Sequence, residues 1–253
     1  NPVALGAGYG SIANRVSYFL DLNGPSIALD TMCSSSLSAL SLAVDSIRLG
    51  HCEMAIVGGV NLSLHPNKYL MHAQMNMVSG EGKCKAFGEN ADGFVAGEGI
   101  GAMVITPKSI EQNNKAHIYG IVKAVANNHD GKTNGYTVPN PSLQTAVVET
   151  ALQIAEVDPR TISYIEAHGT GTSLGDPIEI TGLSNAFGAY TQDKQFCKIG
   201  SVKSNIGHLE AAAGIAGIFK VLLQMQQQQL VPSINAEVLN GNIDFSDTPF
   251  IVQ

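Results

Sequence analysis

Short apolar runs rich in β-branched residues alternate along this chain with segments whose apolar residues recur at helical spacing. Such runs predict buried strands, and the segments between them predict amphipathic helices. The expected strands are residues 26–29, 54–60, 100–106, 118–126, 162–167 and 196–202. No low-complexity linker interrupts the alternation. The pattern therefore predicts an α/β fold, in which ligand sites usually lie at the ends of strands.

The first expected helix begins just after Cys33, and Gly50 is placed to close it as a left-handed cap. Its core face would consist of Leu37, Leu40, Val44 and Ile47. The last expected helix passes through Ile215, Phe219 and Leu222, and the glutamines at 226–229 would form its solvated end. Just before it, the sequence AAAG at 211–214 allows very close packing against a neighbour.

Two other helices carry a capping residue followed by proline. Asn140 and Pro141 open one, whose core face would be Leu143, Val147, Thr150 and Ile154. Asp176 and Pro177 open the other, where Glu179 would complement the helix dipole.

The composition suits a domain with much buried surface, since 44% of the 253 residues are hydrophobic and only 14% are charged. The formal net charge is −7, so neither nucleic acid nor a membrane surface is expected as a partner, because both need a basic face. Four scattered cysteines and the lack of a leader or membrane-length segment favour reduced thiols in the cytoplasm. The chain has no initiating Met, and we expect it to be a piece of a longer polypeptide.

Cys33 is the first candidate for chemistry. It lies between an expected strand and an expected helix, so the helix dipole would favour its thiolate, which is the nucleophilic form. Its backbone amide can also face an oxyanion on an attacked carbonyl. The alternative, from this stretch alone, is a small buried residue that precedes a core helix.

His168, Lys203 and His208 form the second group of candidates. His168 ends an expected strand and precedes GTGT at 169–172, whose two threonines can hydrogen-bond an extended polar ligand. Lys203 and His208 lie in a glycine-containing turn before the last helix. Taken singly, each stretch fits a structural histidine or ordinary loop polarity equally well. No second ligand at helical spacing supports a metal site.

Glycines and carboxylates elsewhere are interpreted as structural. Gly97, Gly99 and Gly101 lack the strand-turn-helix spacing of a phosphate-binding loop, so we expect tightly packed backbone there. The carboxylates expected to be structural partners or helix caps, rather than a general acid–base pair, are Asp92, Glu98 and Asp176.

Taken together, three stretches resemble the signature motifs of β-ketoacyl synthases, in matching order and separation. They are DTMCSSSL at 30–37, EAHGTGTSLGDPIE at 166–179 and KSNIGH at 203–208. Three further stretches resemble the ketosynthase domains of modular polyketide synthases, in particular the subgroup served by separate acyltransferases. These are HPNKY at 65–69, GKCKAF at 82–87 and GKTNGY at 131–136.

The resemblance implies a thiolase-like fold of two similar halves, each a mixed sheet sandwiched by helices, in a homodimer. It places residues 1–118 in the half with Cys33 and residues 119–253 in the half with both histidines. The segment 26–31 would then meet its twin near the dimer axis. Family members carry further N- and C-terminal portions, and the latter supplies a second oxyanion amide.

The resemblance also implies the chemistry. Cys33 would take an acyl chain from the phosphopantetheine arm of an acyl carrier protein and condense it with a decarboxylating malonyl unit. Neutral His168 and His208 would donate to the enolate oxygen, while Lys203 would organise the site and disfavour imidazolium. Thr170 and Thr172 would bind the pantetheine amides. No metal or redox cofactor is implied, and neighbouring synthase domains would be further partners.

Four alternatives remain open at this point. A non-elongating ketosynthase, which only transfers acyl chains, commonly lacks the histidine found here at position 168. A catalytically dead scaffold subunit usually replaces the nucleophile, which is present as Cys33. A thiolase would use a second cysteine as base, and a fatty-acid-type ketoacyl synthase would share the fold.

Overall fold

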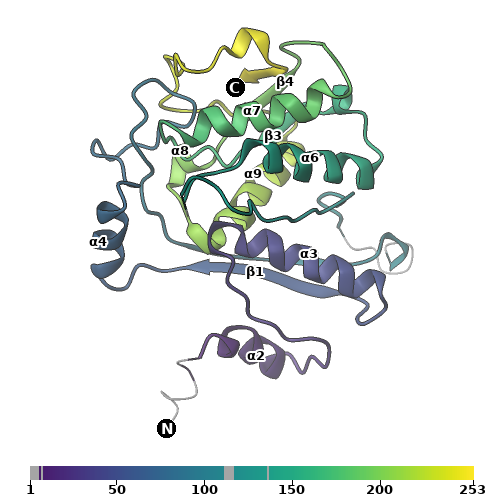
Figure 1. Ribbon diagram of the computed structural model, residues 1–253. Coiled ribbons are helices and arrows are strands. Elements are labelled where there is room, and N and C mark those ends of the chain that lie inside the picture. The colour runs from purple at the N-terminus through teal and green to yellow at the C-terminus, as the bar shows by residue number, and fades with distance from the viewer. Residues whose placement is uncertain (1–5, 7, 111–116, 136) are drawn as a thin grey trace.

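The computed structural model describes residues 6, 8–110, 117–135 and 137–253. Within these residues the strands form two separate sheets. Strands β1 (Ala55–Asn61) and β2 (Gly99–Ile105) pair antiparallel, with Ala55 opposite Ile105 and Asn61 opposite Gly99. Strands β3 (Tyr164–Glu166), β4 (Cys197–Gly200) and β5 (Phe250–Val252) run parallel in that order. Figure 1 shows the parallel sheet above the antiparallel pair.

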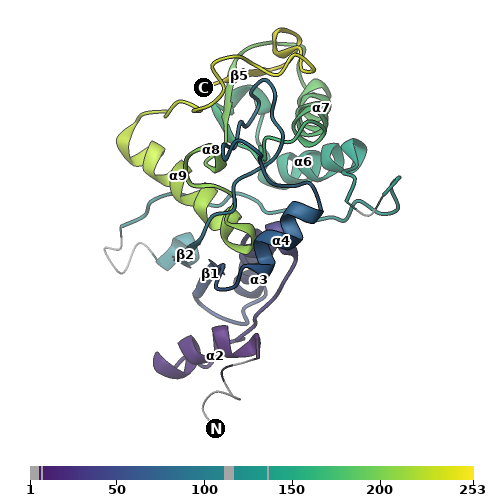
Figure 2. The same cartoon turned by 90° about the vertical axis from the view of Figure 1, so that its left-hand side faces the viewer.

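Seven α-helices are described with these strands. They are α2 (Gly10–Phe19), α3 (Ser35–Arg48), α4 (Asn67–Gln74), α6 (Pro141–Ala155), α7 (Gly175–Gly188), α8 (Lys203–Ile206) and α9 (Ala213–Gln227). The 3₁₀ turns are η1 (Met32–Ser34), η2 (Lys108–Ile110), η3 (Pro159–Thr161), η4 (Glu210–Ala212) and η5 (Phe245–Asp247). In Figure 2, α9 covers one side of the parallel sheet and α6 and α7 cover the other.

The largest core cluster lies between the parallel sheet and α7. Ile199 on β4 and Phe250 on β5 are fully buried, and Phe187 on α7 packs its ring 5.2 Å from that of Phe250. Phe87 also belongs to this cluster, although it lies far earlier in the sequence than the other residues named here. Buried side chains of β4, β5 and α7 therefore form the centre of this cluster.

Helix α9 contacts strands of both sheets and also α3. Its close approach to α3 depends on Gly214, where a Cβ would lie 2.6 Å from Cγ of Leu37. The hydroxyl of Ser36 accepts a hydrogen bond from the backbone N–H of Ile215 at 3.0 Å. The predicted close packing of the AAAG stretch is therefore confirmed, and it joins the element after Cys33 to the element after His208.

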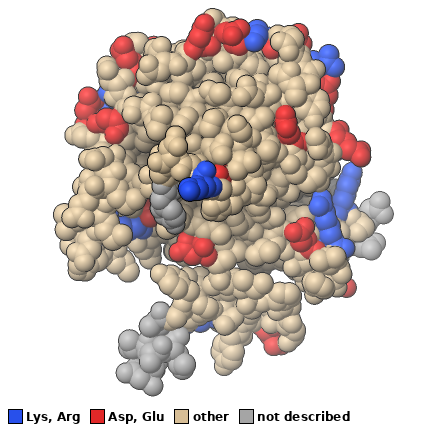
Figure 3. Space-filling model, in the orientation of Figure 1, with Lys and Arg blue, Asp and Glu red and all other residues tan. Residues whose placement is uncertain are grey.

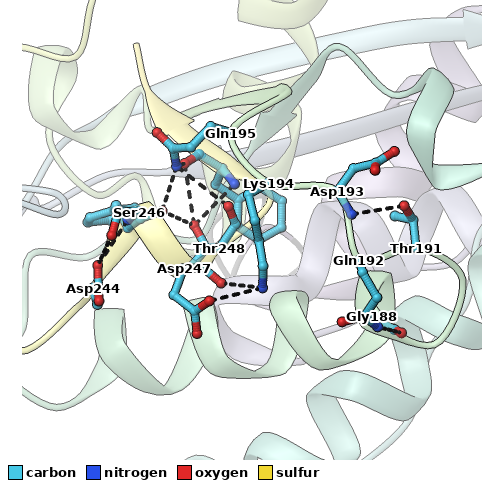
Figure 4. Close-up of polar contacts among 12 residues, drawn as sticks. Gly188, Thr191, Gln192, Asp193, Lys194, Gln195, Asp244, Ser246, Asp247 and Thr248 are labelled. Atoms are coloured by element: carbon cyan, nitrogen blue, oxygen red, sulfur yellow. Dashed lines mark hydrogen bonds and ion pairs between the residues drawn. The ribbon is translucent and has the colours of Figure 1, made fainter.

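Gln195 and Lys194 hold the C-terminal segment against β4 (Figure 4). The side-chain amide of Gln195 donates to the backbone oxygens of Phe245 and Phe250. Nζ of Lys194 lies 3.2 Å from Oδ1 of Asp247. These contacts stabilise the position of β5 at the edge of the parallel sheet.

Four of the six predicted strands are confirmed: 54–60, 100–106, 162–167 and 196–202. The predictions for 26–29 and 118–126 are wrong, because both segments are irregular and neither belongs to a described strand. A strand needs a hydrogen-bonding neighbour, and local β-propensity cannot supply one. Within the described residues these two segments have no such neighbour.

The helices are confirmed, but their details differ from the predictions. Gly50 has the predicted left-handed conformation, with φ 74°, and Asn140 caps α6 by accepting from the N–H of Ser142. Three predicted core positions are wrong: Leu37, Thr150 and Ile154 are exposed. In α6 the buried residue is instead Leu152. The apolar residues of α6 itself lie on several of its sides, so their periodicity did not identify the face that packs.

Charged side chains are scattered over the face drawn in Figure 3, with acidic and basic groups interspersed. None of the residues of helix α2 is buried, and the same holds for α4. Among the described residues, no helix has both the length and the apolar character needed to cross a membrane.

Candidate active site

Cys33 lies in a tight turn that three side chains clamp. Met32, just before it, has a φ of 57°, a left-handed conformation that costs free energy for a residue with a Cβ. The N–H of Met32 donates to Oδ1 of Asp30 at 2.9 Å, and the hydroxyl of Ser35 donates to the carbonyl of Met32 at 2.6 Å. The hydroxyl of Ser34 donates to the carbonyl of Thr31 at 2.8 Å. The turn is therefore held in a strained shape at the proposed nucleophile.

The expected thiolate is not the resting form of Cys33. Burial raises the pKa of the thiol above its ordinary value, and this outweighs the lowering by the Lys203 ammonium and by the backbone N–H of Cys33 itself. Cys33 is half-buried, and helix α3 begins only at Ser35. The prediction placed the sulfur at the helix N-terminus, but one turn of 3₁₀ helix intervenes. The thiol of Cys33 therefore keeps its proton at neutral pH.

His208 is almost completely enclosed, with 1% of its surface exposed. Its N–H donates to the carbonyl of Val95 at 2.7 Å, and its carbonyl accepts from the N–H of Gly97 at 3.0 Å. On the ring, Nδ1 accepts from the backbone N–H of Glu210 at 2.9 Å. An Nδ1 that accepts carries no proton, so in the neutral ring the proton sits on Nε2.

His168 follows β3 and is held by Glu179 on α7. The two carboxylate oxygens of Glu179 accept from the N–H groups of His168, at 2.6 Å, and Gly169, at 2.8 Å. Gly169 has a φ of 43°, and a Cβ there would lie 2.7 Å from Cβ of Ser201. Glu179 was predicted to complement the helix dipole, and the structure assigns it this second, more specific contact.

The two imidazole rings lie side by side. Their centroids are 5.5 Å apart at an interplanar angle of 85°. Burial is the main cause that lowers the pKa of His168 to about 3 and that of His208 to about 2, and the Lys203 ammonium lowers both further. His168 remains open to solvent on one side although dense protein surrounds its ring. Both rings are therefore neutral donors or acceptors near pH 7, as predicted.

Lys203 connects the candidate residues electrostatically. Its side chain is buried at the start of α8, and burial lowers its pKa, while Glu179 and Glu166 oppose that effect. Its charge acts on Cys33 and on both histidines. Turn η1, which contains Cys33, contacts η4, which follows His208, and also α9. The structure thus brings the predicted groups Cys33, His168, Lys203 and His208 to one region of the fold.

Thr170 and Thr172 lie beside this region, with their hydroxyls 3.3 Å apart. Thr170 is buried, and the hydroxyl of Thr172 also accepts from the N–H of Gly175 at 3.1 Å. Their role toward a pantetheine arm stays a prediction. Cys84 packs against this loop, since its Sγ lies 3.4 Å from the carbonyl of Thr170. Burial raises the pKa of Cys84 to about 12, so this thiol keeps its proton at neutral pH.

The structural roles predicted for three carboxylates are confirmed, with one correction. Asp92 accepts from the N–H of Gly80 at 2.8 Å, and Glu98 accepts from the N–H of Ser63. Asp176 does not cap its own helix, because α7 begins at Gly175 with Leu174 as its N-cap. It instead accepts from the N–H of Phe87 at 2.8 Å and of Gly171 at 3.1 Å. The Asp-Pro signature predicted the start of the helix correctly, but the predicted capping role of the Asp176 carboxylate is wrong.

The predicted tight backbone at the glycine series is confirmed. A Cβ on Gly97 would lie 2.5 Å from the carbonyl oxygen of Ile206, and one on Gly99 would lie 2.5 Å from Cδ2 of Leu209. This segment therefore lies directly against the turn that carries His208.

Sequence reasoning missed Glu166 and Lys220. Glu166, the last residue of β3, accepts from the N–H of Val202 at 2.5 Å, just before Lys203. Its other oxygen lies 2.9 Å from Nζ of Lys220, and both side chains are about nine-tenths buried, with 11% and 9% exposed. The apolar spacing of α9 predicts its buried face but gives Lys220 no role. A Lys on that buried face was the available signal for a buried acidic partner.

Comparisons with known proteins identify the family of this chain. The N-terminal domain model of β-ketoacyl synthases matches residues 1–110, and the C-terminal domain model matches residues 119–237. The chain belongs to the β-ketoacyl synthase family.

Among solved structures, the ketosynthase is 51% identical to the oxazolomycin ketosynthase domain OzmH KS7 of Streptomyces albus, with a TM-score of 0.96 over 98% of this chain. It is 46% identical, at the same TM-score, to the ketosynthase from module 6 of the bacillaene synthase of Bacillus subtilis. The predicted thiolase-like fold is therefore confirmed.

Among curated proteins, the ketosynthase is 62% identical over 251 residues to polyketide synthase PksL of Bacillus subtilis. It is 58% identical over 253 residues to polyketide synthase ThaG of Burkholderia thailandensis. It spans 6% and 4% of the length of these relatives, and 44% of the chain in each of the two solved structures.

Proposed function

We propose that this ketosynthase extends a polyketide chain by decarboxylative Claisen condensation. One observation carries the proposal: two neutral imidazoles lie 5.5 Å apart, and His208 keeps its proton on Nε2. Two uncharged N–H donors suit an oxygen that becomes negative only during reaction, because the fold places both rings before that charge develops. Removing one such donor typically costs roughly 3 kcal/mol of barrier.

In the first half-reaction, Sγ of Cys33 attacks the acyl thioester of a carrier protein. The new S–C bond replaces the bond to the pantetheine sulfur, and the departing thiol takes up the proton that Cys33 loses. Little chemical driving force is needed, so the turn mainly positions the sulfur and its amide N–H for the tetrahedral oxyanion. The strained Met32 turn serves this positioning.

In the second half-reaction, a malonyl thioester loses carbon dioxide. The electron pair of the broken C–C bond forms an enolate, whose oxygen accepts from His168 and His208. The enolate carbon then attacks the carbonyl of acyl-Cys33, and the sulfur of Cys33 leaves as a thiolate, which takes a proton from water to restore the thiol. The product is a β-ketoacyl thioester on the carrier protein, and the proposed reaction uses no metal or redox cofactor.

Acyl carrier proteins and neighbouring synthase domains are the proposed partners, with Thr170 and Thr172 binding the pantetheine arm. HPNKY at 65–69 and GKCKAF at 82–87 support assignment to synthases served by separate acyltransferases. In the third stretch, at 131–136, residue 136 lies outside the described residues. Polyketide synthase relatives favour a product of secondary metabolism over a fatty acid.

We also propose that the ketosynthase is a homodimer. Helix α2 carries an exposed apolar surface, on which Tyr18 is 91% and Phe19 is 85% exposed. Apolar area of this kind is rarely left in contact with water. The adjoining segment 26–31 is unpaired within the described residues, which suits the predicted contact with its twin.

The deciding experiment uses the intact ketosynthase domain, an acyl thioester and a malonyl-carrier protein. We expect an acyl adduct on the protein that Cys33→Ala abolishes, followed by a β-ketoacyl product on the carrier. An adduct without any β-ketoacyl product would instead identify a non-elongating ketosynthase. Absence of the adduct from the wild-type domain would identify a scaffold subunit.

A further inference from the structure

Glu210 has a backbone conformation that its residue type disfavours. Its φ of 44° lies in the left-handed region, which a residue with a Cβ adopts only where surrounding contacts hold it. In that conformation its backbone N–H donates to Nδ1 of His208 at 2.9 Å. The hydrogen bond that fixes the His208 tautomer therefore belongs to a strained turn.

Two residues one turn apart on α4 anchor the side chain of Glu210. Nζ of Lys68 lies 3.0 Å from Oε1, and Nε2 of His72 lies 3.7 Å from Oε2. The side chains of Lys68, Glu210 and His72 are 27%, 23% and 14% exposed, so solvent screens these contacts less than at an open surface. The ring of His72 also packs edge-on against Phe94, whose ring packs in turn against His208.

Lys68 reaches His208 by a second route. Its Nζ donates to Oδ1 of Asn61, the last residue of β1, which is buried. Nδ2 of Asn61 donates to the carbonyl of Gly97 at 2.7 Å. The N–H of Gly97 donates to the carbonyl of His208 at 3.0 Å. One route from Lys68 thus ends on the imidazole ring and the other on the backbone of the same residue.

We propose that Lys68 is a positioning residue for the condensation step, acting on His208 through Glu210 and Asn61. It holds the left-handed turn at Glu210, and that turn keeps the proton of His208 on Nε2, where it meets the enolate oxygen. The inference rests on the proposed function. Lys68 belongs to the HPNKY stretch at 65–69, to which the condensation mechanism gives no task.

Loss of Lys68 would change the pH dependence of condensation. If the turn relaxes, Nδ1 of His208 is free to take a proton, and the carboxylate of Glu210 is left without its ammonium partner. Both changes favour imidazolium, which cannot be the neutral donor. The charged and titratable groups that face His208 are Lys203 on α8, His168 after β3, His72 on α4 and Glu210 on η4.

The test compares three variants of the intact ketosynthase domain: Lys68→Met, Lys68→Arg and the control Lys194→Met. Lys194 also pairs with a carboxylate, that of Asp247, but on the exposed surface at the C-terminal segment. Acylation of Cys33 is followed by intact mass, and condensation by formation of the β-ketoacyl carrier protein. Both rates are measured from mildly acidic to mildly basic pH.

We expect Lys68→Met to lower the condensation rate between about 10- and 100-fold, since displacing a catalytic group by ~1 Å can cost about 100-fold. Its acid limb should move to higher pH, while acylation of Cys33 stays close to wild type. Lys68→Arg should restore both rate and pH profile, and Lys194→Met should change neither. Wild-type condensation by Lys68→Met, or parallel loss of both half-reactions with an unmoved pH profile, would overturn the inference.

A second pair of variants tests the strained turn directly. Glycine adopts left-handed φ values without penalty, whereas alanine does not. Glu210→Gly should therefore retain more condensation activity than Glu210→Ala, although both lack the carboxylate. The reverse order would overturn the role of the turn. A wild-type domain that acylates Cys33 but makes no β-ketoacyl product would overturn the proposed function, and this inference with it.

Discussion

At the scale of single residues, burial sets the protonation states of the site. The thiol of Cys33 is kept protonated at rest, and both imidazoles are kept neutral. Burial raises the pKa of the thiol and lowers the pKa of both imidazoles. The cause is the same in each case, since burial disfavours whichever form carries charge. The proposed reaction would therefore begin with Cys33 and both histidines uncharged, and charge would develop on them only as bonds change.

His208→Asn should make the domain less sensitive to acid. A histidine whose pKa falls on folding binds protons more weakly in the folded state, so the free energy of unfolding decreases as pH drops below the unfolded value of about 6.5. With a folded pKa of about 2, His208 should cost about 2 kcal/mol of stability at pH 5. Denaturant unfolding of both proteins at about pH 5 and about pH 7.5 measures this loss of stability, because the two values lie on either side of the unfolded histidine pKa. Equal acid losses in both proteins would contradict the prediction.

Glu179→Gln should slow condensation by about tenfold and spare acylation of Cys33, because the His168 turn would shift while the nucleophile turn stays in place. The amide side chain offers one oxygen for the two N–H groups that Glu179 now satisfies. Separate assays of the two half-reactions measure the split. The matched control is Glu53→Gln, at an exposed residue just before β1. Equal slowing of both half-reactions would show a general structural effect instead.

At the scale of elements, α9 is the helix on which the site depends, because it joins both sheets and the helix after Cys33. Its first turn follows directly on His208 and η4. A shift of α9 would therefore move the candidate motifs of Cys33 and His208 relative to each other.

Gly214→Ala should destabilise the domain by about 1–3 kcal/mol, the usual cost of overpacking a tight contact. The added Cβ would lie 2.6 Å from Cγ of Leu37 and 2.8 Å from Oγ of Ser36. Gly188→Ala on α7 is the control, since a Cβ there meets nothing within 4 Å. It should be neutral or stabilising by up to about 1 kcal/mol. Thermal unfolding of both variants decides, and similar effects at both positions would count against the packing argument.

Local sequence predicted elements well where the deciding contacts were local. The left-handed Gly50 and the Asn140 cap needed only their own neighbours in the chain. The strand predicted at 26–29 failed because pairing is a property of distant residues. The left-handed conformation of Glu210 was not predictable, because the distant residues Lys68 and His72 on α4 hold its side chain. That of Met32 depends on the nearby residues Asp30 and Ser35, whose hydrogen bonds no sequence pattern indicated.

At the scale of the whole molecule, three motifs far apart in sequence meet because two sheets pack against one helix. The motifs predicted the shared site of Cys33, His168 and His208 by resemblance. The supporting contacts were not predicted, since Glu166, Glu210 and Lys68 act through backbone groups and through one another. No spacing rule along the chain encodes those partners.

Phe19→Asp should shift the intact domain from dimer to monomer, because it places a charge on the exposed apolar surface of α2. Sedimentation analysis over a range of protein concentrations measures the change. Tyr190→Asp, at an exposed aromatic residue just after α7, is the control. A Phe19→Asp protein that stays dimeric would place the contact between copies elsewhere.

The clamped turn at Met32 has a consequence for engineering hybrid synthases. A β-branched residue at position 32 would oppose the left-handed conformation, whereas glycine or asparagine would accept it. Asp30 and Ser35 hold that conformation from either side. If Cys33 alone were transplanted, it would lack the side chains that hold its turn. Residues 30–35 form the smallest segment that can be exchanged as one part.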